Sequence, residues 1–198
     1  DSTHTVNLNY LLDRLKGDGK GEGGWKVNFN NLRVRDSRFS LRSFDAEPMA
    51  YGVNYSDMRL TDINGDVRHF NPGKDSLSFD IRSFQFREQS GFVLHRLSGT
   101  FSEARTFLKL YDFRAETPHS SMKGRALTLK FTDYDAFKAG SFVQQVRMLA
   151  DLDPCAIDFY DIGFFAPAFQ ETHQKVTVSG IARGTVSNLK TKKIEIRF

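Results

Sequence analysis

Residues 79–86 read FDIRSFQF, a stretch with apolar side chains at Phe79, Ile81, Phe84 and Phe86. Side chains of a β-strand alternate between its two faces, so the first pair and the second pair would fall on opposite faces of a regular strand. A β-bulge at Ser83 adds one residue to the strand and cancels this slip. The stretch therefore predicts a bent strand that keeps one apolar face.

The same spacing recurs along the chain. The octads that start at residues 27, 53 and 79 follow one another at an interval of 26 residues, and a fixed interval of this size is typical of stacked repeat architectures. Short polar residues accept the unusual backbone of a bulge, and one precedes the third apolar position of every octad, namely Asn31, Asp57, Ser83, Asp112 and Asp161. The other octads are Val27, Phe29, Leu32 and Val34; Val53, Tyr55, Met58 and Leu60; Leu108, Leu110, Phe113 and Ala115; and Ile157, Phe159, Ile162 and Phe164.

The segments between the octads are too short for helical crossovers and contain turn residues, so we expect turns and returning strands there. A turn is predicted at residues 63–66, where the sequence is Ile-Asn-Gly-Asp. Alternating apolar residues predict returning strands at 39–41, 67–70, 92–94, 127–131 and 176–178. The predicted fold class is mainly all-β: a long antiparallel meander whose bulged strands curl into an open groove, a β-taco, with an apolar concave side.

Three regions are predicted along the chain. Leu8, Leu11, Leu12 and Leu15 form one stripe of a short amphipathic helix within residues 1–17. A glycine-rich linker follows at 18–24. Residues 25–198 are expected to form a single curved antiparallel domain, as a fragment of a larger protein. One helical turn is expected near residues 133–137.

Composition argues against several classes of function. The net charge is +4, but the basic residues are scattered singly along predicted strands, so we do not expect nucleic-acid binding. The single cysteine, Cys155, forms part of an alternating run and is expected to be a packed thiol. The five histidines lack metal-ligand spacing, and no nucleophile motif is present. We therefore expect no catalytic residue, no metal and no cofactor, and thus not an enzyme.

An open apolar groove would bind acyl chains, because each buried methylene contributes about 0.8 kcal/mol. The octad residues, Ala115 excepted, are the predicted lipid-binding residues. Three alternatives remain open: the apolar face is the core of a closed sandwich or barrel, the chain is a chaperone-like module that adds strands to its edge, or it is a carbohydrate-binding sandwich.

Several motifs resemble the TamB-like translocation and assembly module proteins of Bacteroidetes, in the AsmA/TamB superfamily. The resemblance covers nearly the whole chain and is carried by residues 6–17 with Trp25–Val27, by 86–92, 117–121 and 161–167, and by 180–189. The stretches Glu88–Phe92 and Thr117–Ser121 are expected to form turns.

The resemblance implies a periplasmic protein anchored in the inner membrane, of which this chain would be an internal fragment. It implies a role in phospholipid transport and outer-membrane biogenesis, with phospholipid acyl chains as ligands and contacts to outer-membrane assembly proteins through the missing C-terminal part. Self-association of the fragment is a further expectation, because a piece of a stacked sheet has uncapped ends.

Overall fold

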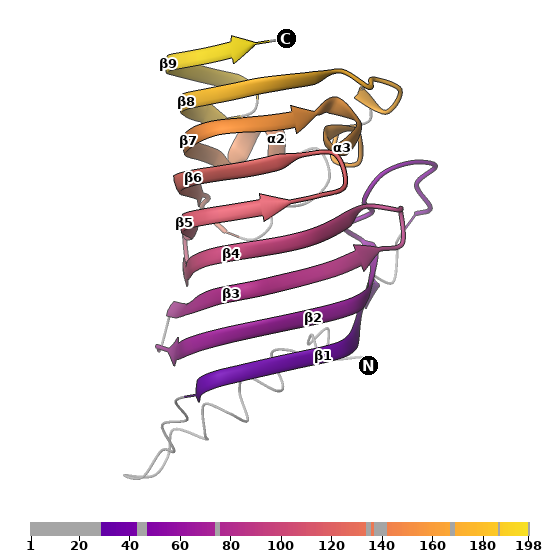
Figure 1. Ribbon diagram of the computed structural model, residues 1–198, viewed down its shortest axis with the longest axis vertical. Coiled ribbons are helices and arrows are strands. Elements are labelled where there is room, and N and C mark those ends of the chain that lie inside the picture. Colours follow the sequence, from indigo (N-terminus) through magenta and orange to yellow (C-terminus); the bar gives the residue numbers. More distant parts are fainter. Residues whose placement is uncertain are drawn as a thin grey trace.

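In the part of the chain that the computed structural model describes, nine β-strands hydrogen-bond in sequence order to form one sheet (Figure 1). The structure describes residues 29–42, 47–73, 76–133, 136, 142–166, 169–185 and 187–197. Every neighbouring pair is antiparallel, which confirms the predicted meander. The strands are β1 (Phe29–Arg42), β2 (Asp57–Pro72), β3 (Ser76–Glu88), β4 (Val93–Ala104), β5 (Phe107–Glu116), β6 (Ser121–Lys130), β7 (Arg147–Asp158), β8 (Lys175–Thr185) and β9 (Asn188–Arg197).

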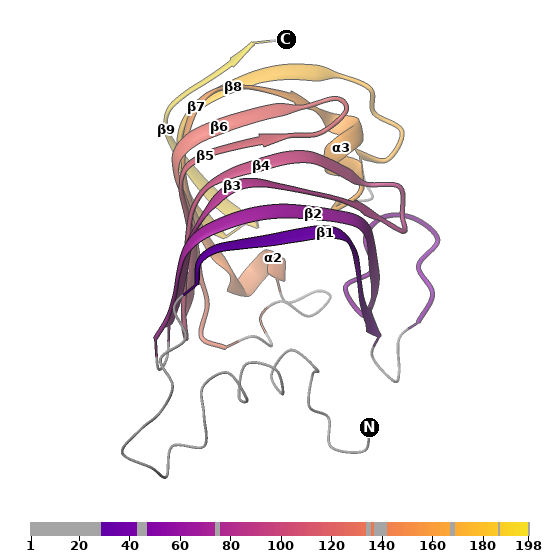
Figure 2. The same ribbon diagram turned by 60° about the horizontal axis from the view of Figure 1, so that its bottom comes forward.

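The sheet is open and arched. Its strands bend over together, and the two short helices α2 (Phe142–Gln145) and α3 (Phe159–Gly163) lie under the arch (Figure 2). Strands β1 and β9 are the two edges of the sheet and do not pair with each other among the described residues. The predicted fold class, an open curved antiparallel sheet, is confirmed, and the described strands do not close into a barrel.

Two of the predicted bulges lie where the octads place them. Ile81 pairs with Gly99 and Phe84 pairs with Leu97, so three residue steps on β3 match two on β4 around Ser83. In β5, Asp112 has a φ of 44°, and the β4–β5 register shifts beside it. All four apolar residues of each of these octads therefore share the concave face.

The prediction of bulges at Asn31 and Asp57 is wrong. The register of β1 and β2 shifts instead near Asp36 and Asp62, which have φ values of 43° and 53°. The Asn64 side chain joins the two sites, because its Oδ1 accepts a hydrogen bond from the Asp36 N–H at 3.2 Å and its Nδ2 donates to the Asp62 carbonyl at 3.1 Å. These two bulges are still 26 residues apart, but each lies five residues later than predicted, so the interval to the bulge at Ser83 is 21 residues.

Because the bulges are displaced, the strands and the turn predicted near the first two octads are assigned differently. Residues 39–41 and 67–70 continue β1 and β2 rather than returning as new strands, and the predicted turn at 63–66 lies in the middle of β2. A bulge lets one long strand bend around the arch without a turn. The returning strands predicted at 92–94, 127–131 and 176–178 are confirmed in substance as β4, β6 and β8.

Two octads are not bulged strands. Val53 and Tyr55 precede β2, in the segment 47–56, which contains no strand. Phe159 and Ile162 lie in α3, and Phe164 is the C-cap of this helix. The helix begins here because the Asp158 side chain accepts a hydrogen bond from the Tyr160 N–H at 3.0 Å and caps its N-terminus. The predicted helix at 1–17, the linker at 18–24 and residues 25–27 lie outside the described residues, as does most of the predicted turn at 133–137.

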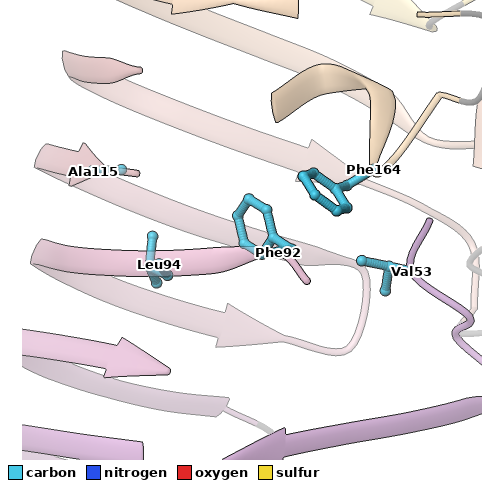
Figure 3. Packing of buried hydrophobic residues seen from close by; sticks show 5 residues of the cluster. All are labelled: Val53, Phe92, Leu94, Ala115 and Phe164. Carbon is cyan, nitrogen blue, oxygen red and sulfur yellow. The ribbon is translucent and has the colours of Figure 1, made fainter. Parts of the chain in front are cut away.

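The core lies on the concave face in two clusters. In the first, Val53 from the segment 47–56 and Phe164 from the end of α3 pack against the sheet (Figure 3); its members are Val53, Phe92, Leu94, Ala115 and Phe164. In the second, Phe131, Ala136 and Val146 pack against Leu108 and Leu129. Segments between strands therefore fill two parts of the arch.

Candidate functional site

An apolar row crosses the concave face between the two core clusters. The Phe79 ring lies 6.0 Å from the Phe70 ring and 4.9 Å from the Phe101 ring, centroid to centroid. The strand register continues the row through positions that pair directly with one another, in the order Phe101, Leu110, Leu127, Ala150 and Ala182. The concave face thus carries hydrocarbon and aromatic side chains from one strand to the next across much of the sheet.

The middle of this row is only half-buried. Phe79, Phe101, Leu110 and Leu127 have intermediate exposure, and neither core cluster includes any of these four among the described residues. In contrast, Ile81 and Phe113 are buried. The half-buried row is therefore the part of the concave face with apolar surface left for a ligand.

Many of the predicted lipid-binding residues lie on the concave face. Those of β3 and β5 lie together on the concave face, and Leu32 and Val34 join them because they pair with Val67 and Gly65. Several of these residues contact the protein itself rather than a free surface, since Phe84 and Phe86 pack against the first core cluster and Leu108 packs against the second. Met58 and Leu60 are half-buried on β2. In β1, Phe29 pairs in register with Phe70.

The remaining predicted residues do not line the row. Tyr55 is 54% exposed in a turn, and Phe159 stacks on Phe169 with the centroids 5.1 Å apart. Val53 and Phe164 are core residues. Ile157 pairs with Val176 on β8, Ile162 lies in α3, and Val27 lies outside the described residues.

Sequence reasoning missed Phe101, Leu127 and Phe70 as concave-face residues, although the last two were included in predicted returning strands. The sequence signal for these residues was period-two alternation in strands that lack the octad spacing. In β4, for example, Leu97, Gly99 and Phe101 occupy alternate positions. Because β3 and β5 flank β4, their apolar octads could have indicated that the alternating residues of β4 share the same face.

The two stretches expected to form turns do so. Glu88 is buried at the β3–β4 turn, where its carboxylate accepts a hydrogen bond from the Ser90 N–H at 2.7 Å and its own N–H donates to the Phe92 carbonyl at 2.8 Å. At the β5–β6 turn, the Thr117 and Ser120 hydroxyls donate to the buried Asp161 carboxylate. These carboxylates satisfy local donors and hold turns and α3 in place.

Cys155 is fully buried, as the alternating run predicted. Its single S–H proton is shared between the carbonyl oxygens of Asp153 at 3.0 Å and Lys123 at 3.2 Å, and burial raises its pKa above the ordinary value. A raised pKa disfavours the reactive thiolate, which is consistent with a packed thiol. Within the described residues, no three histidine, cysteine, aspartate or glutamate side chains gather into a metal site.

Comparisons with protein-family models, with curated proteins and with solved structures find no match to the chain. None of the helices in the described part of the chain has the length and apolar character needed to cross a bilayer. The candidate function therefore depends on the geometry of the concave face and on the sequence motifs.

Proposed function

We propose that this chain is a segment of a lipid-conducting β-groove, in which acyl chains lie along the concave apolar row while the headgroup stays in water. The observation that carries the proposal is the alignment of apolar residues along one face of an open, arched sheet, with Phe79, Phe101 and Leu110 half-buried at its middle. Each methylene transferred from water to such a surface contributes about 0.8 kcal/mol.

The resemblance to TamB-like proteins supplies the cellular setting of this proposal. In that setting the chain belongs to a larger periplasmic protein anchored in the inner membrane, and the groove supports phospholipid transport and outer-membrane biogenesis. The mechanism is passive, since it involves no covalent step. Directionality would come from other parts of the larger protein.

A charge on the apolar row should abolish lipid uptake. We expect Phe101→Glu to reduce the uptake of a fluorescent phospholipid by delipidated protein about tenfold or more, because a carboxylate resists transfer into hydrocarbon. The matched control is Tyr111→Glu, on the neighbouring strand but on the convex face, where Tyr111 is 36% exposed and lies near Lys109 Nζ.

Circular dichroism should show the same strand content in both variants. If Phe101→Glu does not fold, Phe101→Gln introduces a polar group without a charge and should still weaken uptake. Equal uptake by folded Phe101 and Tyr111 variants would rule out the concave row as the lipid site.

A second candidate function is strand addition to an edge of the sheet, as in a chaperone for outer-membrane β-segments. It is favoured by the open edges, since β9 pairs only with β8 among the described residues and exposes Leu189 and Ile196. Charged residues on β9, such as Lys192 and Glu195, would limit unspecific pairing.

Proline substitutions on β9 test this alternative. Successive amides of an edge strand point alternately to its neighbour and outward, so one of Glu195→Pro and Ile196→Pro removes an outward donor. That variant should bind an outer-membrane β-peptide several-fold more weakly in fluorescence anisotropy and keep its lipid uptake. If both variants bind the peptide as the unsubstituted protein does, β9 is not the edge that accepts a strand.

A further inference from the structure

A cationic pocket lies where α2 leads into β7, beside the end of β8 and the start of β9. Its volume is about 460 Å³, and its lining residues are Gln144, Gln145, Arg147, Arg183, Gly184, Thr185, Asn188 and Lys190. Among the described residues, the side chains in this lining are either cationic or neutral hydrogen-bonding groups, and none is a carboxylate. Ala182 belongs to the concave row and consecutive side chains of a strand alternate between its faces, so Arg183 and its partner Lys190 lie on the convex face, at the ends of these strands.

Like charges face each other directly in this region. Arg183 pairs in register with Lys190, and Arg147 pairs with Lys130. Like charges at directly opposed positions destabilise a sheet. Within the part of the chain that the structure describes, none of these four residues forms an ion pair with a carboxylate.

A second basic pocket, on the strands β4 to β7, also has directly opposed like charges, Arg114 and Lys123, but carboxylates partly neutralise it. It contains Arg96, Arg114, Lys123 and Arg125, but Asp112 and Asp153 also line it. In addition, Arg125 forms an ion pair with Asp151 at 2.8 Å. The pocket beside α2 differs because its positive charges lack such partners among the described residues, and an external anion would supply them.

We propose that Arg147, Arg183 and Lys190 form a binding site for a phosphate group. Guanidinium groups match phosphate oxygens with paired hydrogen bonds, and a lysine ammonium adds a point charge. The amides of Gln144, Gln145 and Asn188 and the hydroxyl of Thr185 supply further neutral donors. The phosphate belongs either to a phospholipid headgroup or to a soluble phosphate compound. The site goes beyond the proposed groove, since it does not require acyl-chain binding.

The test uses two probes on the full chain, inorganic pyrophosphate and vesicles of phosphatidylglycerol diluted in phosphatidylcholine. The variant R183Q/K190Q should bind the physiological type of probe about tenfold more weakly or worse, because two charge-assisted contacts are lost. The control R96Q/R114Q removes the same number of charges from the partly neutralised pocket and should bind within about twofold of the unsubstituted protein. Raising the salt concentration should weaken binding of the unsubstituted protein.

The two probes separate the sources of the phosphate. Loss of pyrophosphate binding alone indicates a soluble compound, and loss of vesicle binding alone indicates a headgroup; both results support the site. If R183Q/K190Q and R96Q/R114Q bind the probes equally weakly, the loss of binding follows from net charge alone and the proposal is overturned. A failure of the unsubstituted protein to bind either probe would overturn it as well.

Failure of the phosphate-site proposal can also be distinguished from failure of the lipid-groove proposal. R183Q/K190Q relieves a like-charge pair, so its thermal stability should not fall, and Phe101→Glu should lose acyl-chain uptake but keep pyrophosphate binding.

Discussion

Replacing Gly99 with alanine is expected to destabilise the protein by about 2–4 kcal/mol. Gly99 lies on β4 with a φ of 143°, which side-chain-bearing residues rarely adopt. An added Cβ would lie 2.7 Å from the Tyr111 carbonyl oxygen and 3.0 Å from the Phe113 Cα. Because both contacts are with backbone on the two sides of the Asp112 bulge, a rotamer change cannot relieve them.

The measurement is urea denaturation monitored by circular dichroism, with the thermal midpoint as a second readout. Each kcal/mol corresponds to a shift of roughly 2–4 °C in a domain of this size. The control is Gly91→Ala, since Gly91 also has a positive φ of 99° but its Cβ would meet only Phe164 ring atoms, at 3.7 Å or more. It should cost about 1 kcal/mol for backbone strain alone.

The difference between the two variants therefore isolates the close approach of β4 to the bulged strand. Equal destabilisation would mean that the Asp112 bulge does not depend on a glycine beside it. The same result would weaken the reason given for the alignment of the β5 octad, because that alignment requires the bulge to be held in place.

The fold class was predictable because the octad spacing has one simple explanation in a strand, and the bulges at Ser83 and Asp112 confirm it. The spacing alone cannot separate a bulged strand from a helix, since residues three apart also share a helix face. Phe159 and Ile162 are three apart and lie in α3. The capping aspartate Asp158, just before them, was the signal that distinguishes the two.

The Asn64-Gly65 pair was misleading for a different reason. This dipeptide is typical of tight hairpin turns, but Asn64 here bridges two bulges by hydrogen bonds. Gly65 leaves room for Phe84, whose ring lies 3.0 Å from where a Cβ would be. The role of Asn64 depends on Asp36, 28 residues away, and that of Gly65 depends on Phe84, 19 residues away; a local pattern contains neither partner.

The candidate site was predicted in outline, as the apolar concave face, but its extent was not. Residues 53–55 and 157–164 have the octad spacing that indicated strands, so the sequence did not show that the segment 47–56 and the region around α3 pack over the sheet instead of joining it. Their positions follow from tertiary contacts such as the hydrogen bond from the Val53 N–H to the Phe164 carbonyl at 2.8 Å. The half-buried row is what those segments leave exposed.

Phe164→Ala is expected to cost about 3–5 kcal/mol of stability, the usual range for truncation of a buried phenylalanine. The Phe164 side chain is 5% exposed and its ring packs against those of Tyr51, Phe92 and Tyr160 at centroid distances of 5.7, 5.8 and 5.4 Å. Its loss removes the contact that holds α3 and the segment 47–56 on the strands.

The measurement is again urea denaturation, combined with amide hydrogen exchange. Protection should fall first in the segment 47–56, because Val53 donates its N–H to Phe164 and loses the neighbouring ring. Phe165→Ala is the matched control, since the side chain of Phe165 is 49% exposed although its ring contacts Phe92 at 4.8 Å. It should cost about 1 kcal/mol.

Lipid uptake separates the packing role of Phe164 from a ligand-binding role. If Phe164 only fills the arch, a folded Phe164→Ala variant exposes more of the concave face near Phe92 and Leu94 and should take up at least as much fluorescent phospholipid as the unsubstituted protein. A loss of uptake comparable to that of Phe101→Glu would instead place Phe164 in contact with the acyl chain. The lipid path would then extend over the first core cluster rather than stop at its edge.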